Sequence, residues 1–256
     1  MKQRKLLTSL FLAAALSISL LTGCGNTGSG TSETKHTENS ATEEQTTSVQ
    51  KESETDENQD AADQLLCDLK GTYQELWPVI LADEYDQLWL DDSAAIVGED
   101  NAQAAVEKMS SMVTGTVTGE EAVETYKDGN MAYDCEFLQN IDQFTFDGTT
   151  ISGVDEEGND VFSHSYHYVG MEETRGLYIY ESDDADSGEF TYFCIAPDTM
   201  KTTWHIEFRY GSDLDALEKY DAGEYAYWLA AGISVDYTKA DVENLSLIHI
   251  SEPTRR

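Results

Sequence analysis

Three of the five histidines fall on two short segments in which apolar and polar residues alternate. In the segment 202–210, the two alternating sets are Trp204, Ile206, Phe208 and Tyr210 against Thr203, His205, Glu207 and Arg209. Because successive side chains of a β-strand point to opposite faces, His205 and Glu207 lie side by side on one face. Imidazole nitrogen and carboxylate oxygen both bind zinc, so this pair is a candidate metal site. The alternative is a strand with an apolar core face and a polar face in solvent.

The other two histidines of this set, His164 and His167, belong to the segment Ser163-His164-Ser165-Tyr166-His167. An offset of three residues places them on opposite faces of a regular strand. At most one of them can therefore join His205 unless a bulge intervenes. Each alone is typical of a hydrogen-bonded structural histidine, but the restriction of all three to two segments favours a shared site.

The elements that would position these side chains are mostly short strands. Period-two patterns bounded by turn residues predict strands at 131–138, 143–147, 149–154, 160–169, 176–182, 189–196 and 202–210. Seven strands in succession with no helix between them favour an antiparallel meander, which closes as a barrel or folds as a sandwich.

Helices are predicted on both sides of the strand region. We expect helical segments at 63–70, at 73–90 with an interruption at Pro78, from Thr118 to Gly129, from Ser212 to Tyr220, and from Thr238 onward. Thr118 and Ser212 are the expected N-cap residues of their helices, as is Thr238. The expected class is mainly β, with flanking helices.

The overall charge excludes one large class of partner. The chain has 50 Asp and Glu against 15 Lys and Arg, a formal net charge of −35. Such a surface repels phosphate backbones, so no nucleic-acid binding is expected, and it agrees with a cationic ligand. Phosphate-binding loops, nucleophile elbows and paired His–Cys motifs are absent from the sequence, so it is not expected to be an enzyme.

The N-terminal residues 1–23 have the form of an export signal. Basic residues among the first five precede an apolar run from Leu6 to Leu21, which ends in Leu21-Thr22-Gly23-Cys24. This order resembles the bacterial lipobox, in which Cys24 is acylated and becomes the mature N-terminus. Residues 24–60 then predict an acylated cysteine followed by a disordered, acidic tether. The remaining cysteines are Cys67, Cys135 and Cys194; Cys67 and Cys194 lie in apolar contexts and are expected in the core.

The C-terminal residues 245–256 begin LSLIHISEPTR, which resembles an in-frame translation of a sequencing adaptor. We expect this stretch to be an artefact that packs against nothing, and His249 within it to take no part in a site. The folded domain is then expected at 61–244.

Several motifs in order resemble the ZinT (YodA) family of exported zinc-binding domains, which also occur as the C-terminal part of some Gram-positive lipoproteins. They are Asp68–Pro78 (DLKGTYQELWP), Asp86–Trp89 (DQLW), Arg175–Glu181 (RGLYIYE), Ile195–Pro197 (IAP) and His205–Gly211 (HIEFRYG). The resemblance covers most of residues 65–244. It implies a lipocalin-like (calycin-like) antiparallel β-barrel with flanking helices.

The resemblance also implies a zinc site made of three histidines. His205 matches the first residue of the family's His-x-His pair, and Glu207 replaces the second. The third ligand of the family precedes Ile-Ala-Pro, where this chain has Phe193 and Cys194. His164 is therefore the first candidate for the missing ligand, and His167 the next.

The expected function is that of an extracytoplasmic protein anchored by lipid to a bacterial cell membrane. It would bind zinc or another divalent transition metal and serve an ABC-type metal importer or its solute-binding component. The alternative is a lipocalin-like binder of a small organic ligand whose metal site has decayed.

Overall fold

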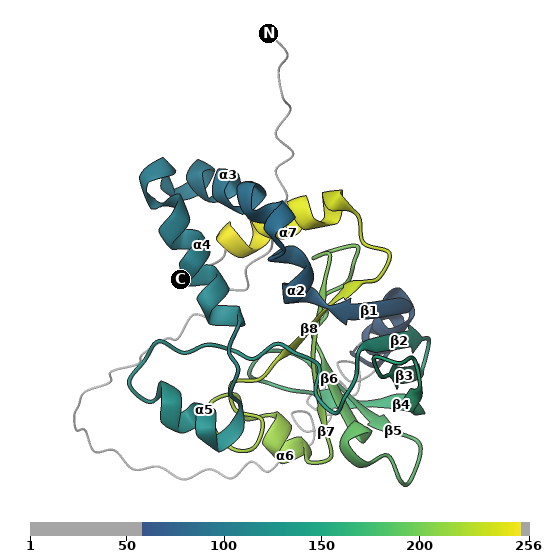
Figure 1. Cartoon of the computed structure of the whole chain (residues 1–256). Coiled ribbons are helices and arrows are strands. Elements are labelled where there is room, and N and C mark those ends of the chain that lie inside the picture. Colours follow the sequence, from purple (N-terminus) through teal and green to yellow (C-terminus); the bar gives the residue numbers. More distant parts are fainter. Residues whose placement is uncertain (1–57, 252–256) are drawn as a thin grey trace, which may run out of the picture. The chain divides into compact units, whose positions relative to one another are not determined.

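Eight antiparallel strands form a closed barrel in the computed structural model, which describes residues 58–251 (Figure 1). The strands are β1 (Gly71–Glu75), β2 (Gln143–Asp147), β3 (Thr150–Val154), β4 (Asp160–Met171), β5 (Tyr178–Ser182), β6 (Tyr192–Ile195), β7 (Ile206–Gly211) and β8 (Ala230–Ser234). Each strand pairs with its neighbour in sequence, and β1 pairs with β8. The expected antiparallel barrel with flanking helices is confirmed.

Turn chemistry fixes the register of the meander. The β2–β3 hairpin closes on the pair Asp147 and Thr150, and Gly148 between them has a φ of 64°, which glycine adopts at little cost. A register shift between Tyr168 and Gly170 introduces an irregularity near the end of β4.

Two strands of the barrel were not predicted, and one predicted strand is wrong. Residues 131–138 form only an isolated bridge, between Asp134 and Trp228. β1 overlaps the start of the stretch 73–90 that is expected to be helical, and β8 has the sequence AAGIS, which lacks polar alternation. The pairing of β1 with β8 closes the barrel, so tertiary context decides both strands.

Aromatic side chains fill the interior of the barrel. Phe144 contacts Phe193, Phe208 and Tyr210 with ring centroids 5.1–6.0 Å apart. The helix formed by residues 58–68 contributes Leu65 and Leu66 to the same core, as does Leu69 just after it, and Tyr180 Oη donates to the carbonyl of Ala62 at 2.8 Å. Among residues 58–251, buried aromatic and aliphatic side chains therefore occupy the interior of the barrel.

The remaining helices lie outside the barrel. They are α2 (Leu76–Ile80), α3 (Asp86–Val97), α4 (Glu99–Val113), α5 (Gly119–Tyr126), α6 (Leu214–Leu217) and α7 (Lys239–Ser251), with 3₁₀ turns η1 (Asp83–Tyr85) and η2 (Gly188–Phe190). Helices α3, α4 and α7 pack on one another, and α2 contacts β8 (Figure 1). Within residues 58–251, no helix combines the length and apolarity that a bilayer crossing requires.

Helix boundaries agree with the sequence in part. α5 begins after Thr118, as expected, but the Thr118 side chain makes no capping bond. Asp213, not Ser212, caps α6 by accepting from the Ala216 amide at 3.1 Å, and that helix ends before Tyr220. Thr238 precedes α7 and exchanges hydrogen bonds with Asp241, as its capping role predicts.

Two expectations about burial are wrong. α7 continues to Ser251, and both Leu245 and Ser246 are fully buried, with Ser246 Oγ bonded to Asp92. Leu245 and Ser246 therefore pack on the domain, contrary to the expectation for this stretch. Cys67 is exposed rather than in the core, whereas Cys135 and Cys194 are buried.

Candidate metal centre

The outward face of β7 carries the polar residues that alternation predicted. Ile206, Phe208 and Tyr210 belong to the core that fills the barrel. His205, Glu207 and Arg209 have the opposite parity, and His205 stands immediately before the strand. This face is not solvent surface, because His205 is 4% exposed and Arg209 is completely buried.

Asp198 joins His205 and Glu207 from the loop between β6 and β7. One potential ligand atom from each of the three residues lies within 4.8 Å of the other two. Sequence reasoning missed Asp198, although it directly follows the Ile195–Pro197 motif. With 50 acidic residues in the chain, no local pattern distinguishes this carboxylate from the others.

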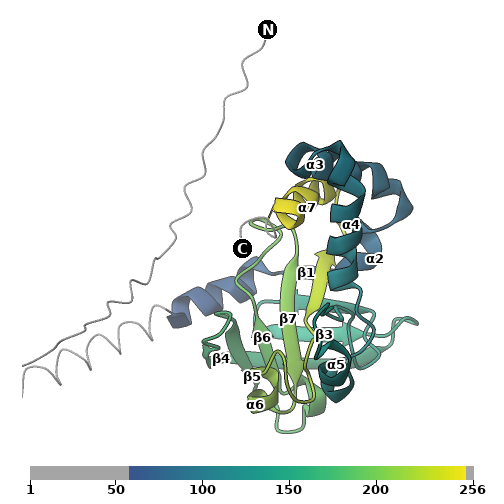
Figure 2. The same cartoon turned by 90° about the vertical axis from the view of Figure 1, so that its left-hand side faces the viewer.

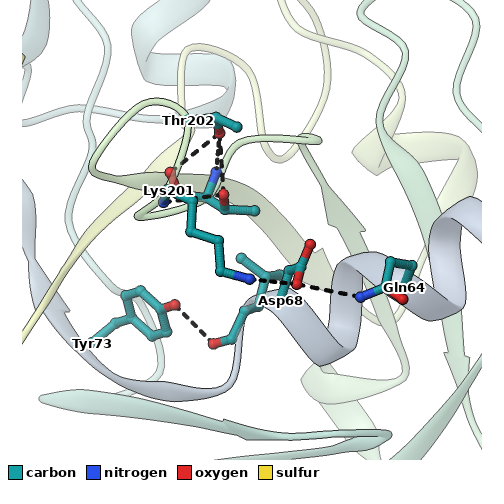
Figure 3. Close-up of polar contacts among 7 residues, drawn as sticks. Gln64, Asp68, Tyr73, Lys201 and Thr202 are labelled. Atoms are coloured by element: carbon teal, nitrogen blue, oxygen red, sulfur yellow. Dashed lines mark hydrogen bonds and ion pairs between the residues drawn. The ribbon is translucent and has the colours of Figure 1, made fainter.

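Thr199 holds the loop in a single compact turn. Its carbonyl accepts from the amides of Thr202, Thr203 and Trp204 at 2.9–3.1 Å, and its own amide donates to Thr202 Oγ1 at 3.0 Å. Lys201 extends from the loop to Asp68 of the first helix (Figure 3). Its Nζ lies 2.7 Å from Asp68 Oδ1. Asp198 is thus presented by a segment whose backbone is already ordered.

The backbone also orients the imidazole of His205. Its Nδ1 lies 2.8 Å from the carbonyl oxygen of Thr203, so Nδ1 carries the proton and donates. Trp204, which lies between Thr203 and His205, has a φ of 60°. This left-handed conformation is costly for a bulky residue, and it allows the His205 imidazole to fold back toward the Thr203 carbonyl. Nε2 is left with a lone pair for a ligand, which is the usual arrangement of a metal-binding histidine.

Glu207 lies at a distance from Nε2 that suits two ligands of one ion. His205 Nε2 and Glu207 Oε1 are 3.6 Å apart, too far for a good hydrogen bond. Two ligands placed 2.0–2.1 Å from a tetrahedral zinc ion are about 3.3 Å from each other. The Glu207 side chain is 32% exposed, so solvent and ions reach the pair.

The two side chains stabilise each other's charged forms. Burial alone would lower the pKa of His205, but the Glu207 carboxylate outweighs it and raises that pKa. Burial alone would raise the pKa of Glu207, and the imidazole outweighs it and lowers that pKa. The site therefore favours a positive charge at His205 Nε2, and either a proton or a metal ion can supply that charge.

Arg209, the third residue on this face, has a structural role. Its guanidinium donates to the carbonyls of Leu217, Lys219 and Tyr225 and lies 4.6 Å from the Tyr220 ring centroid. It ties β7 to α6 and to the segment before β8, and it belongs to no metal-binding group.

His164 and His167 lie elsewhere in the structure. His164 Nδ1 is 2.7 Å from Asp184 Oδ2, and His167 Nδ1 is 2.7 Å from Asp183 Oδ1. Neither histidine belongs to the group of Asp198, His205 and Glu207. Cys194 is also outside this group, and burial raises its pKa to about 12. Cys24, the expected lipidation site, lies outside the described residues.

His249 of α7 covers the imidazole of His205. Their ring centroids are 5.2 Å apart, and His249 also contacts Trp77 at 5.0 Å. Burial, together with the neighbouring His205, lowers the pKa of His249 to about 4. Figure 2 shows α7 beside the upper end of β7. The ring shields the site, but its ligand atoms are not part of the group around Glu207.

Fold and site together define an eight-stranded antiparallel barrel with one histidine and two carboxylates on a covered outer face. No protein-family model and no curated protein matches the chain. Among solved structures, the chain is similar to the Zn(II)-bound ZinT-like domain of Streptococcus pneumoniae AdcA, with a TM-score of 0.44 and 16% identity over 73% of this chain and 89% of that one. It is also similar to Zn(II)-bound AdcA of the same organism, with a TM-score of 0.43 and 16% identity over 72% of this chain and 35% of that one.

Proposed function

We propose that this chain binds zinc or another divalent transition metal through Asp198, His205 and Glu207. The observation that carries the proposal is the convergence of three ligand atoms within 4.8 Å, one of them on an imidazole whose Nδ1 already donates to a backbone carbonyl. A lone histidine beside a carboxylate would bind zinc weakly, and Asp198 supplies the third ligand that holding an ion requires.

The ligand set narrows the choice of ion. One nitrogen and two carboxylate oxygens suit zinc and neighbouring transition metals, whereas calcium and magnesium take oxygen ligands. Three protein ligands leave a fourth position for water. The barrel core supports this choice over binding of an organic ligand, because aromatic side chains occupy the interior.

The export and transport roles rest on the sequence. The signal-like residues 1–23 and Cys24 support an extracytoplasmic protein anchored by lipid to a bacterial membrane. We propose that the bound metal is cargo, captured for an ABC-type importer or its solute-binding component. A partly exposed site with an open coordination position fits release better than a closed structural site does.

Equilibrium dialysis of the full chain against zinc tests the metal-binding proposal. The wild type should retain one equivalent more than the His205→Ala variant, while His167→Ala should retain as much as the wild type. Equal retention by the wild type and His205→Ala would contradict the proposal. Circular dichroism of each variant checks that the barrel remains folded.

A further inference from the structure

A groove between α2, the end of α4 and the segment before β2 has an apolar end and an acidic end. The apolar end is a cavity of about 260 Å³ whose wall includes Trp77, Leu81 and Val113. The acidic end is a cavity of about 430 Å³. Glu75 and Glu136 line both cavities, so the two adjoin and form one groove. No residue of the groove belongs to the metal centre.

Backbone contacts hold the walls of the groove in place. The amide of Gly115 donates to the Tyr133 carbonyl at 2.9 Å, and the amide of Tyr133 donates to the Met112 carbonyl at 2.8 Å. Glycine permits this approach, because a Cβ at Gly115 would lie 2.8 Å from the carbonyl carbon of Tyr133. On the other wall, Glu75 Oε1 accepts from the Phe137 amide at 2.8 Å. An ordered groove lowers the entropy cost of binding a ligand.

The negative charge at the acidic end is not neutralised within the described residues. Asp142 and Glu156 line this end together with Glu75 and Glu136, and none of the four forms an ion pair within residues 58–251. The residues that line the two cavities include no Lys, Arg or His. Burial raises the pKa of Glu75, and the charges of Glu136 and Asp142 contribute to the increase. A positively charged ligand would relieve this repulsion between carboxylates.

The apolar end offers carbon surface that a ligand can reach. Pro78 is exposed, and Leu81 and Val113 are half-buried. Trp77 beneath them belongs to the core cluster under the helices. A side chain that covers these residues removes apolar surface from water, which stabilises the complex. An occupant that matches both ends therefore carries an apolar side chain next to positive charge.

The charge of the chain itself argues against two occupants. A second copy would bring another net charge of −35 to a surface that is already acidic. Residues 25–60 of the same chain hold nine acidic residues against two basic ones. Like charges repel both, so the occupant belongs to another molecule, of opposite charge.

We propose that this groove is a docking surface for a segment of a partner protein in which an apolar side chain is flanked by Lys or Arg. The apolar side chain occupies the end lined by Trp77, Leu81 and Val113, and the cationic groups lie against Glu75 and Glu136. The groove shares no residue with the metal centre, so docking and metal binding can each fail without the other.

Titration of the full chain with the capped peptide Lys-Lys-Leu-Lys-Lys, followed by NMR after metal removal by a chelator, tests the proposal. Binding should saturate with a dissociation constant below about 1 mM and shift the amide signals of Gly115 and Phe137. The peptide Lys-Lys-Ser-Lys-Lys should bind at least about 10-fold more weakly, because it lacks the leucine that the apolar end would bury. This comparison leaves the protein unchanged, so it does not depend on the folding of a variant.

Two charge reversals locate the binding on the surface. Glu136 is exposed and lines the groove, and Glu136→Lys should weaken binding of the leucine peptide at least about 5-fold. Glu218, directly after α6, is also exposed and lines neither cavity. Glu218→Lys changes the net charge equally and should alter the affinity by less than about 2-fold.

Three results would overturn the proposal. One is the absence of saturable binding of the leucine peptide. The second is equal affinity for the leucine and serine peptides, or equal losses from the two charge reversals, since either means general attraction to an acidic surface. The third is binding of n-butylammonium as tight as that of the leucine peptide, which would make the groove a site for a small organic cation.

Discussion

Strands β4 and β7 both carry histidine beside carboxylate, but the two strands differ in what covers them. On β7, the polar face lies under a structured loop and α7, and His205 is 4% exposed. On β4, His164 borders an open cavity, and His167 is half exposed. The same residue types thus lie on a largely covered face at β7, where Glu207 is 32% exposed, and beside an open cavity at β4.

The difference shows how environment determines the partner of a histidine. His205 donates to a backbone carbonyl and faces two carboxylates, while His164 and His167 each take one loop aspartate as a partner. Interactions between charged groups are stronger where water is excluded, so the β7 group should bind metal more tightly.

The largest loss of stability should follow from replacing Arg209, the buried residue on the covered face of β7. Replacing it by alanine removes donors to three backbone carbonyls and leaves a cavity, at a cost of about 3–5 kcal/mol in the free energy of unfolding. Ser163→Ala on the exposed face of β4 should change that free energy by less than about 0.5 kcal/mol. Urea denaturation measures both, and equal small losses would show that the two faces are covered alike.

Removing the part of α7 after Asn244 should cause the next largest loss of stability. A chain that ends at Asn244 loses Leu245, which is fully buried, and Ser246 with its bond to Asp92. We expect the free energy of unfolding to fall by about 2–4 kcal/mol, by analogy with truncating a buried leucine. Thermal denaturation of the shortened and full chains tests this. An unchanged midpoint would restore the expectation that the segment packs against nothing.

Zinc affinity should then distinguish the carboxylates of the two regions. Glu207→Gln keeps the shape of the side chain but removes its charge, and should weaken zinc binding about 10- to 100-fold, or about 1.4–2.8 kcal/mol. Glu181→Gln is the control, because Glu181 lies opposite His167 in the β4–β5 pair. Competition titration with a zinc indicator measures both variants. A similar loss for Glu181→Gln would mean that the general acidity of the surface, and not the geometry at β7, determines affinity.

Replacing Asp198 should weaken zinc binding less than replacing Glu207. Asp198→Asn retains a carbonyl oxygen as a weaker ligand on the same ordered loop, so we expect a loss of affinity of about 10-fold. Lys201→Ala, which breaks the contact with Asp68, should cost less because the Thr199 hydrogen bonds remain. Calorimetric titration with zinc ranks the two variants, and the reverse order would make loop anchoring more important than the Asp198 ligand.

Sequence alternation predicted much of the β region and two of the three residues of the proposed site, His205 and Glu207. The i, i+2 spacing in 202–210 predicted that His205 and Glu207 lie together, and their side chains are 3.6 Å apart, although His205 precedes β7 and residues 202–205 form a turn and a bend rather than a strand. The pattern could not reveal Asp198, because a loop residue reaches the site only through the tertiary turn around Thr199. It also could not distinguish a polar face in solvent from one buried under helices, because α7 lies far along the chain from β7. β8 was missed because alanine and glycine carry no alternating signal.

A crystal structure of the zinc-loaded full chain, with anomalous diffraction recorded at the zinc edge, tests the central claim most directly. We predict the strongest anomalous peak about 2.0–2.1 Å from His205 Nε2, with carboxylate oxygens of Asp198 and Glu207 within about 2.2 Å of the same ion. A strongest peak at His164 or His167, with no peak between His205 and Glu207, would contradict the assignment of the metal centre to β7.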